Sequence, residues 1–205
     1  MPIVHLNSIA IDPRNPYRFA VAGSDVYARV YDIRMCRRDG KPCGKPADCF
    51  VPLHLIGDNH FEITGLAFSD QSELLASYNL DVIYLFLKDQ GLGPNPYSIY
   101  SNSTMTNGHT MQTYKGHINC KTIKGVNFFG PNCEYVTSGS DCGRLFIWRK
   151  KGGELLRVMK GDKHVVNCIE SHPYTTMLAS CGIKKSIKIW LPNAVEQAAP
   201  IDFYE

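Results

Sequence analysis

Short runs of alternating hydrophobic and polar residues recur along the chain, and a turn follows each run. Ile9 and Ile11 alternate with smaller or polar neighbours, and the segment 63–68 repeats this spacing. A period of two is typical of a half-buried β-strand. The turn at Asp12-Pro13 separates two such runs, because proline presets a turn and ends a ladder of hydrogen bonds. No segment carries a helical stripe of useful length, so the pattern predicts an all-β chain.

The runs follow one order that occurs four times. Each copy has an alternating run, a turn, a second apolar run, small residues, a tight polar turn and a third alternating run. The third runs end in aromatic residues, at Tyr31, Phe86, Trp148 and Trp190. The last two lie roughly 40 residues apart, which suits a repeat that forms one small sheet. The four copies occupy residues 6–34, 63–87, 123–149 and 166–191.

Three of the repeated phrases resemble the WD-repeat β-propeller family. They read "GSDVYARVYDIR", "GSDCGRLFIWR" and "GIKKSIKIWL", and the pair Gly116-His117 precedes the third repeat. The resemblance implies that each phrase is the hairpin between the second and third strands of a propeller blade. Because propellers usually have four to eight blades, and those of this family mostly seven, we expect an incomplete propeller of about four blades, arranged as an arc.

The same resemblance implies structural roles for residues in these hairpins. The small residues permit close packing, the aspartate accepts hydrogen bonds from amides of the turn, and the aromatic residue fills the wedge between sheets. We therefore expect structural roles for Asp25, Asp141, Trp148 and Trp190.

Two segments interrupt the repeats and are interpreted as inserted loops. The first is rich in glycine, proline, lysine and arginine, and the second in polar and small residues. Blades are expected at 1–34, 63–88, 123–160 and 161–191, inserts at 35–62 and 89–122, and a tail at 192–205.

Composition excludes several classes of protein. The chain has 205 residues and a formal net charge of +3, which by itself does not indicate a nucleic-acid protein. No apolar stretch is long enough to cross a membrane, and the N-terminal residues do not resemble a secretory signal. The eight cysteines are scattered through a chain with ample apolar residues, so we interpret them as reduced thiols. These features favour a protein of the nucleus and cytoplasm.

The sequence offers little for a metal site or a catalytic site. Cys36, Cys43 and Cys49 lie near His54 and His60, but their spacing lacks the short pairs that structural zinc sites use. There is no phosphate-binding glycine loop and no nucleophile elbow. We therefore expect no metal, no cofactor and no enzyme activity.

A short sequence motif, here called the box, resembles one particular group within this family. In "VYDIR", Tyr31, Asp32 and Arg34 fit a W-D-x-R pattern, with tyrosine in place of tryptophan. The box resembles that of the substrate receptors of cullin-4 RING ubiquitin ligases, and phrases such as "KGVNFFGP" and "GDKHVVNCIESHP" within 124–191 are similar to the same group. The resemblance implies that Tyr31, Asp32 and Arg34 bind the adaptor, damage-specific DNA-binding protein 1. It also implies a non-catalytic receptor fragment that recruits target proteins, whose identity the sequence does not give.

Two alternatives stay open. One is a general protein-interaction propeller with no link to ubiquitin. The other is an RNA-binding propeller, because basic residues cluster in several turns. No aromatic residues interleave with these clusters, so solvated turns are favoured and a nucleic-acid partner is not expected. The clusters are Arg37-Arg38 with Lys41 and Lys45, then Arg149-Lys150-Lys151, and Lys184-Lys185.

Overall fold

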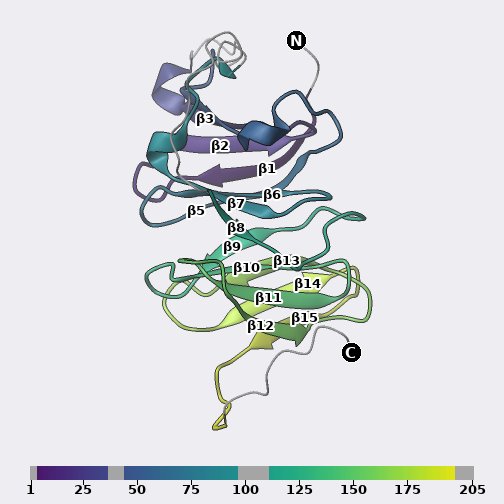
Figure 1. The fold of residues 1–205 in the computed structure, drawn as a ribbon. Helices are drawn as coiled ribbons and strands as arrows, with labels where there is room; N and C mark the ends of the chain where they lie inside the picture. Colours follow the sequence, from purple (N-terminus) through teal and green to yellow (C-terminus); the bar gives the residue numbers. More distant parts are fainter. Residues whose placement is uncertain (1–3, 37–43, 97–110, 197–205) are drawn as a thin grey trace. The chain divides into compact units, whose positions relative to one another are not determined.

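The computed structural model describes residues 4–36, 44–96 and 111–196 (Figure 1). In these ranges the chain forms β-strands and three short 3-10 helices, η1 (Ile33–Met35), η2 (Leu53–Leu55) and η3 (Lys88–Gln90). None of the described helices has the length and apolar character needed to cross a membrane. The expected all-β fold is confirmed.

The strands form four antiparallel sheets in which neighbours in space are neighbours in sequence. Three sheets have four strands and the last has three, within the described ranges. This is the expected arrangement of four propeller blades. The first sheet is β1 (Leu6–Ile11), β2 (Arg18–Gly23), β3 (Ala28–Asp32) and β4 (Asp48–Phe50). The second is β5 (Ile63–Phe68), β6 (Leu74–Tyr78), β7 (Ile83–Phe86) and β8 (Gln112–Tyr114). The third is β9 (Val126–Phe129), β10 (Tyr135–Ser138), β11 (Arg144–Arg149) and β12 (Leu155–Lys160). The fourth is β13 (Val166–Ser171), β14 (Leu178–Gly182) and β15 (Ile187–Trp190).

The chain divides into two compact units, residues 1–113 and 114–205. In the first unit the first two sheets share one apolar core. Asn7 Nδ2 donates to the carbonyl of Ile63 at 3.0 Å, and the amide of Leu66 donates to Ser8 Oγ at the same distance. These bonds fix β1 against β5 (Figure 1). Buried residues of the shared core include Ala20, Val30, Phe50, Leu66, Leu74 and Phe86.

In the second unit the last two sheets pack against each other through β9 and β13. Ser171 Oγ donates to the carbonyl of Phe128 at 2.7 Å, and Asn127 Nδ2 donates to Glu170 Oε2 at 3.0 Å. The apolar cluster between these sheets contains Leu145, Ile147, Val166, Ile169 and Leu178, and Trp190 packs against it.

The third strand of each sheet ends where the aromatic residues predicted it to end. β3 ends one residue after Tyr31, β7 at Phe86, β11 one residue after Trp148 and β15 at Trp190.

The two segments expected to be inserts differ from that expectation in one respect. β4 lies within 35–62 and β8 within 89–122, and each is the fourth strand of its sheet. Strands of three residues are too short to show alternation, so backbone pairing alone defines them.

The small residues at the ends of the second strands are required by close backbone approaches. A Cβ added at Gly139 would overlap the carbonyl oxygen of Val166, and one at Gly182 would overlap that of Val165. At Gly23 the same atom would overlap the carbonyl of His5. A side chain at any of these positions would force the backbone of the adjoining first strand to move.

Candidate functional site

The sequence-predicted box lies at the end of β3. Asp32 is the last residue of the strand and caps the single turn of η1. Its carboxylate accepts the amide of Arg34 at 2.9 Å and the Arg34 Nε–H at 2.9 Å, and it also accepts from Nη2. Three donors from one residue thus converge on one carboxylate, and the turn holds Arg34 in one orientation although its side chain is 58 % exposed.

A third residue, which the sequence did not single out, supports Arg34. Its guanidinium carbon lies 4.7 Å from the ring centre of Tyr17, close enough for a cation–π contact. The amide of Ile33 donates to the carbonyl of Tyr17 at 2.8 Å, so the backbone that carries the ring is tied to η1. The register of β2 and β3 explains this contact. Tyr17 directly precedes β2, and the first residue of β2, Arg18, pairs with Asp32.

The ion pair persists at neutral pH. Hydrogen bonds from the Arg34 side chain lower the pKa of Asp32 to about 2, and the hydrogen bond with Asp32 raises the pKa of Arg34 above its ordinary value. Among the described residues, the Arg34 side chain donates its hydrogen bonds through Nε and Nη2. The Nη1 side of the planar fork therefore remains for an acceptor on another molecule.

Ile33 and Met35 precede and follow Arg34 in η1, and Tyr17 lies against its guanidinium. Ile33 is 57 % exposed, Met35 is 77 % exposed and Tyr17 is 52 % exposed. Together with Arg34 they form what we call the Arg34 surface: Tyr17, Ile33, Arg34 and Met35. A charged fork held in place beside exposed apolar side chains has the composition of a protein-binding surface, in which arginine and aromatic residues are enriched.

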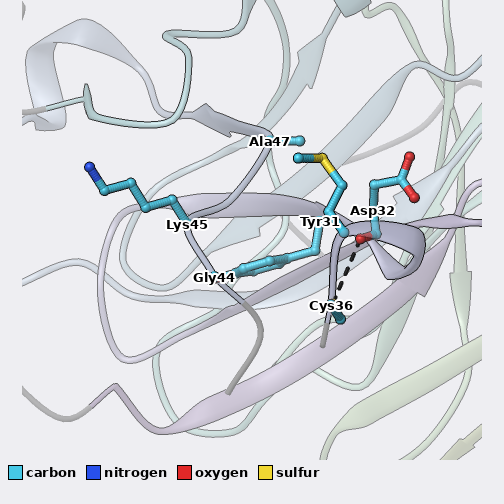
Figure 2. A pocket seen from close by; sticks show the side chains of 7 residues that line it. Tyr31, Asp32, Cys36, Gly44, Lys45 and Ala47 are labelled. Atoms are coloured by element: carbon cyan, nitrogen blue, oxygen red, sulfur yellow. Dashed lines mark hydrogen bonds between the residues drawn. The ribbon is translucent and has the colours of Figure 1, made fainter. Parts of the chain in front are cut away.

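Tyr31 does not join Asp32 and Arg34. Successive residues of a strand point to opposite faces, and in Figure 2 the Tyr31 ring extends toward Gly44 while the Asp32 carboxylate points away. The ring stacks on Phe19 with centres 5.7 Å apart. Beside it lies a hollow of about 10 Å³, room for roughly one water molecule. Of the three box residues, only Arg34 therefore belongs to the Arg34 surface, and Asp32 holds it in place. The adaptor-binding role of all three stays a prediction.

One cysteine beside the box corrects the expectation of eight reduced thiols. Cys36 follows η1 and is disulfide-bonded. The other six cysteines of the described residues are free. The number of cysteines and the apolar content, which favoured reduced thiols, do not show which thiols meet in the folded chain.

The hairpin aspartates sit in two different environments. Asp25 accepts the amide of Tyr27 at 3.3 Å and pairs with Arg29, and both side chains of this pair are about one-fifth exposed. Asp141 is buried. It accepts the amides of Cys120 and Lys121 at 2.7 and 2.8 Å, the Thr122 hydroxyl, and the ammonium of the fully buried Lys124.

The two tryptophans also differ. Trp148 is fully buried and donates its Nε1–H to the carbonyl of Lys115 at 2.9 Å. Trp190 is half-buried and donates to Ser180 Oγ at 2.9 Å. Of the four predicted structural residues, Asp141 and Trp148 therefore lie in the interior, and Asp25 and Trp190 lie nearer the surface.

A basic hollow lies between the last two sheets of the second unit. Its volume is about 330 Å³, and lysines from the β12–β13 connection and from the β14–β15 hairpin line it. Asp162 also lines the hollow and lies 3.7 Å from the Lys188 ammonium, so the charge is only partly compensated. The lysines are Lys160, Lys163, Lys184 and Lys188.

The described residues contain no group of three or more histidine, cysteine, aspartate or glutamate side chains placed to hold a metal ion. Cys43, one of the three cysteines considered for zinc, lies outside the described ranges.

Comparison with known proteins identifies repeats and relatives. Residues 108–149 and 153–190 match the WD domain, G-beta repeat. The chain is 52 % identical over 80 residues to DDB1- and CUL4-associated factor 6 of Homo sapiens. The aligned segment covers 38 % of this chain and 9 % of that protein. It is 50 % identical over 82 residues to Protein ALTERED SEED GERMINATION 2 of Arabidopsis thaliana, covering 40 % and 11 %. WD and tetratricopeptide repeats protein 1 of Homo sapiens is 48 % identical over 81 residues, covering 39 % and 12 %.

The matched part of the chain thus spans about a tenth of the length of these relatives. Two WD repeats are shown at residues 108–149 and 153–190, and a relation to a DDB1- and CUL4-associated factor is shown over part of the chain.

Proposed function

We propose that this chain belongs to a substrate receptor of a cullin-4 RING ubiquitin ligase and binds the adaptor, damage-specific DNA-binding protein 1, through the Arg34 surface. In this role the chain catalyses no reaction. It holds a target protein and the ligase together, and the resulting high local concentration favours transfer of ubiquitin to lysines of the target. The observation that carries the proposal is the geometry of Arg34.

That geometry suits an interface. Asp32 and Tyr17 hold the Arg34 fork in one orientation before any partner arrives, which reduces the entropy lost on binding. A planar guanidinium pairs well with a carboxylate or with carbonyl oxygens. The neighbouring Ile33 and Met35 offer apolar area that a partner would bury.

The relatives support the same group of proteins. One of them is named for its association with the adaptor and the cullin: DDB1- and CUL4-associated factor 6. A finer assignment, to cullin-4-associated factor eight (WD repeat protein 42), comes from the phrases within 124–191 and is part of the proposal. Residence in the nucleus and cytoplasm is likewise proposed from the sequence.

Arg34→Ala is expected to weaken binding of purified damage-specific DNA-binding protein 1 by about tenfold or more, because the partner loses a preorganised charged donor at the interface. The melting temperature should stay nearly unchanged, since the side chain is mostly exposed. Surface plasmon resonance with immobilised adaptor measures the first effect, and thermal denaturation measures the second. Arg34→Lys should bind nearly as weakly, because lysine keeps the charge but lacks the planar fork.

The chain offers a matched control for this experiment. Arg149 is the last residue of the third strand β11, is 56 % exposed like Arg34 and pairs with Glu154 at 3.0 Å, but no aspartate precedes it in a box. Arg149→Ala should leave adaptor binding unchanged. Equal binding by wild type and Arg34→Ala would refute the adaptor-contact role and leave a general interaction propeller as the better interpretation.

The RNA-binding alternative is favoured by one observation, the basic hollow lined by Lys160, Lys163, Lys184 and Lys188. Binding of a single-stranded RNA through these lysines would weaken steeply as salt rises, because each neutralised phosphate releases counterions. A titration of labelled RNA at two salt concentrations, with Lys184→Ala as a variant, tests it. Salt-sensitive binding that the variant reduces would favour this alternative over an adaptor-dependent role.

A further inference from the structure

Two free cysteines face each other across the last sheet. Cys168 on β13 and Cys181 on β14 are direct partners in the antiparallel register, and Figure 1 shows these two strands side by side. Both cysteines are free thiols. No other pair of described cysteines shares a strand register.

The register brings these residues within the range of a disulfide. Directly opposed residues of an antiparallel pair have Cα atoms about 4.5 or 5.5 Å apart, depending on the type of pair. Disulfides are formed across Cα separations of about 4.4 to 6.8 Å. The register therefore places the two residues at a separation that a disulfide can span, next to an irregularity of the ladder between Val166 and Cys168.

Reagents in solution can reach the pair. Cys168 is exposed and Cys181 is half-buried. Along β13 exposure alternates, with Cys168 and Glu170 outside and Ile169 in the core. The thiols thus lie on the face of the sheet that the described residues leave open, next to the exposed Ile187, which is the register partner of Cys181 on β15.

We propose that Cys168 and Cys181 are a redox modification site, which a two-electron oxidant such as hydrogen peroxide converts into a cross-strand disulfide. One thiolate attacks a peroxide oxygen, the O–O bond breaks and hydroxide leaves, giving a sulfenic acid. The second thiolate then attacks that sulfur, the S–S bond forms and the sulfenic oxygen leaves as water. Overall, two thiols and one peroxide give one disulfide and two waters, and a dithiol reductant reverses the change.

The surroundings of the Cys168 thiol affect the rate of disulfide formation more than its final extent. Burial, together with the neighbouring Cys181 and Glu170, raises the pKa of the Cys168 thiol above its ordinary value. The fraction of thiolate at neutral pH is therefore small, and the first step is slow. The second step is fast by comparison, because the resolving thiol lies on the residue directly opposite in the register.

The bond would act on the sheet with the fewest strands. The fourth sheet has three strands in the described residues, and the other sheets have four. Linking β13 to β14 would close a short loop around the connection between them and restrict the unfolded chain. Oxidation is therefore expected to stabilise this sheet without adding any contact to the folded protein.

Peptide mapping after oxidation tests the site directly. The purified chain is treated with excess hydrogen peroxide, and remaining thiols are alkylated with iodoacetamide. Trypsin cuts after Lys163 and Lys184, so both cysteines fall in one peptide. That peptide should lose two hydrogens and escape alkylation in more than half of the molecules. Cleavage after Glu170 then separates the two sulfurs into peptides that stay linked until dithiothreitol is added.

Matched variants and a second readout accompany the map. Cys168→Ser and Cys181→Ser should abolish the linked peptides, and the exposed Cys120, which has no cysteine as its register partner, should not appear in a linked peptide in any sample. The oxidised wild type should melt a few degrees higher than the reduced protein, and neither serine variant should gain this increase. Full alkylation of both cysteines after oxidation, or oxidation of Cys168 to a sulfinic acid without a link to Cys181, would overturn the proposal.

Discussion

Trp148→Ala is expected to lower the free energy of unfolding by about 3–5 kcal/mol, the range measured when a large buried aromatic side chain is truncated in a core. Trp148 is fully buried. Its ring stacks on Phe146 with centres 5.6 Å apart and meets the edge of His117 at 5.8 Å. Alanine would leave a cavity lined by these rings and would also orphan the carbonyl of Lys115, which accepts the indole N–H.

Urea denaturation followed by circular dichroism measures this loss, and two further variants separate its causes. Trp148→Phe keeps most of the packing but loses the hydrogen bond to Lys115, so it should cost about 1–2 kcal/mol. Trp190→Ala should cost less than Trp148→Ala, because Trp190 is only half-buried. Equal stability of wild type and Trp148→Ala would mean that the residue is not packed as described and that the assignment of the third blade is wrong.

The repeated hairpins could be predicted from the sequence because their signals are local. An alternating run before an aromatic residue defines a strand, and the strand ends at Tyr31, Phe86, Trp148 and Trp190 are the clearest example. The need for a small residue before each turn could be predicted in the same way. Gly139 and Gly182 lie where a Cβ would overlap the backbone of the neighbouring segment.

The remaining features depend on contacts between residues far apart in sequence. The strand β4 has three residues and exists because it pairs with β3. Tyr17 supports Arg34 only through the β2–β3 register. The Cys168–Cys181 pair likewise follows from register. None of these three features could be predicted from the sequence, because the residues themselves do not show which strand pairs with which.

The buried pair of Lys124 and Asp141 shows the same limit, and it leads to the second large expected effect. The repeat identified Asp141 as an acceptor for amides of its turn, but nothing indicated that a lysine would be buried against it. The Lys124 side chain is 0 % exposed and that of Asp141 is 2 % exposed. Lys124 also donates to the carbonyl of Thr122 at 2.9 Å, so the ammonium is held by hydrogen bonds as well as by charge.

Asp141→Ala is expected to cost about 3–5 kcal/mol of unfolding free energy, because it leaves a buried ammonium without its counter-charge. The amides of Cys120 and Lys121 would lose their acceptor in the same step. Asp25→Ala is the matched control in the first unit. There the partner Arg29 is 20 % exposed and can turn toward water, so the loss should be clearly smaller.

A double variant separates the charge from the hydrogen bonds. Lys124→Met removes the ammonium and keeps an unbranched apolar chain of similar length. In the background of Asp141→Ala it should restore part of the lost stability, because the double variant no longer buries an unpaired charge. If Lys124→Met instead adds its own full cost to that of Asp141→Ala, the two side chains do not interact and the ion pair is not the reason for the loss.

Acid gives an independent measure of the same pair. Burial alone would raise the pKa of Asp141, but hydrogen bonds from Lys124 and from the amides of Cys120 and Lys121 outweigh it and lower the pKa to about 2. Because the unfolded carboxyl titrates near 4, this stabilisation is fully present above about pH 4 and is lost as the pH falls toward 2. Urea midpoints measured across that window should fall more steeply for the wild type than for Asp141→Asn. Parallel curves would show that Asp141 titrates normally in the folded protein, and the buried ion pair would then not be formed.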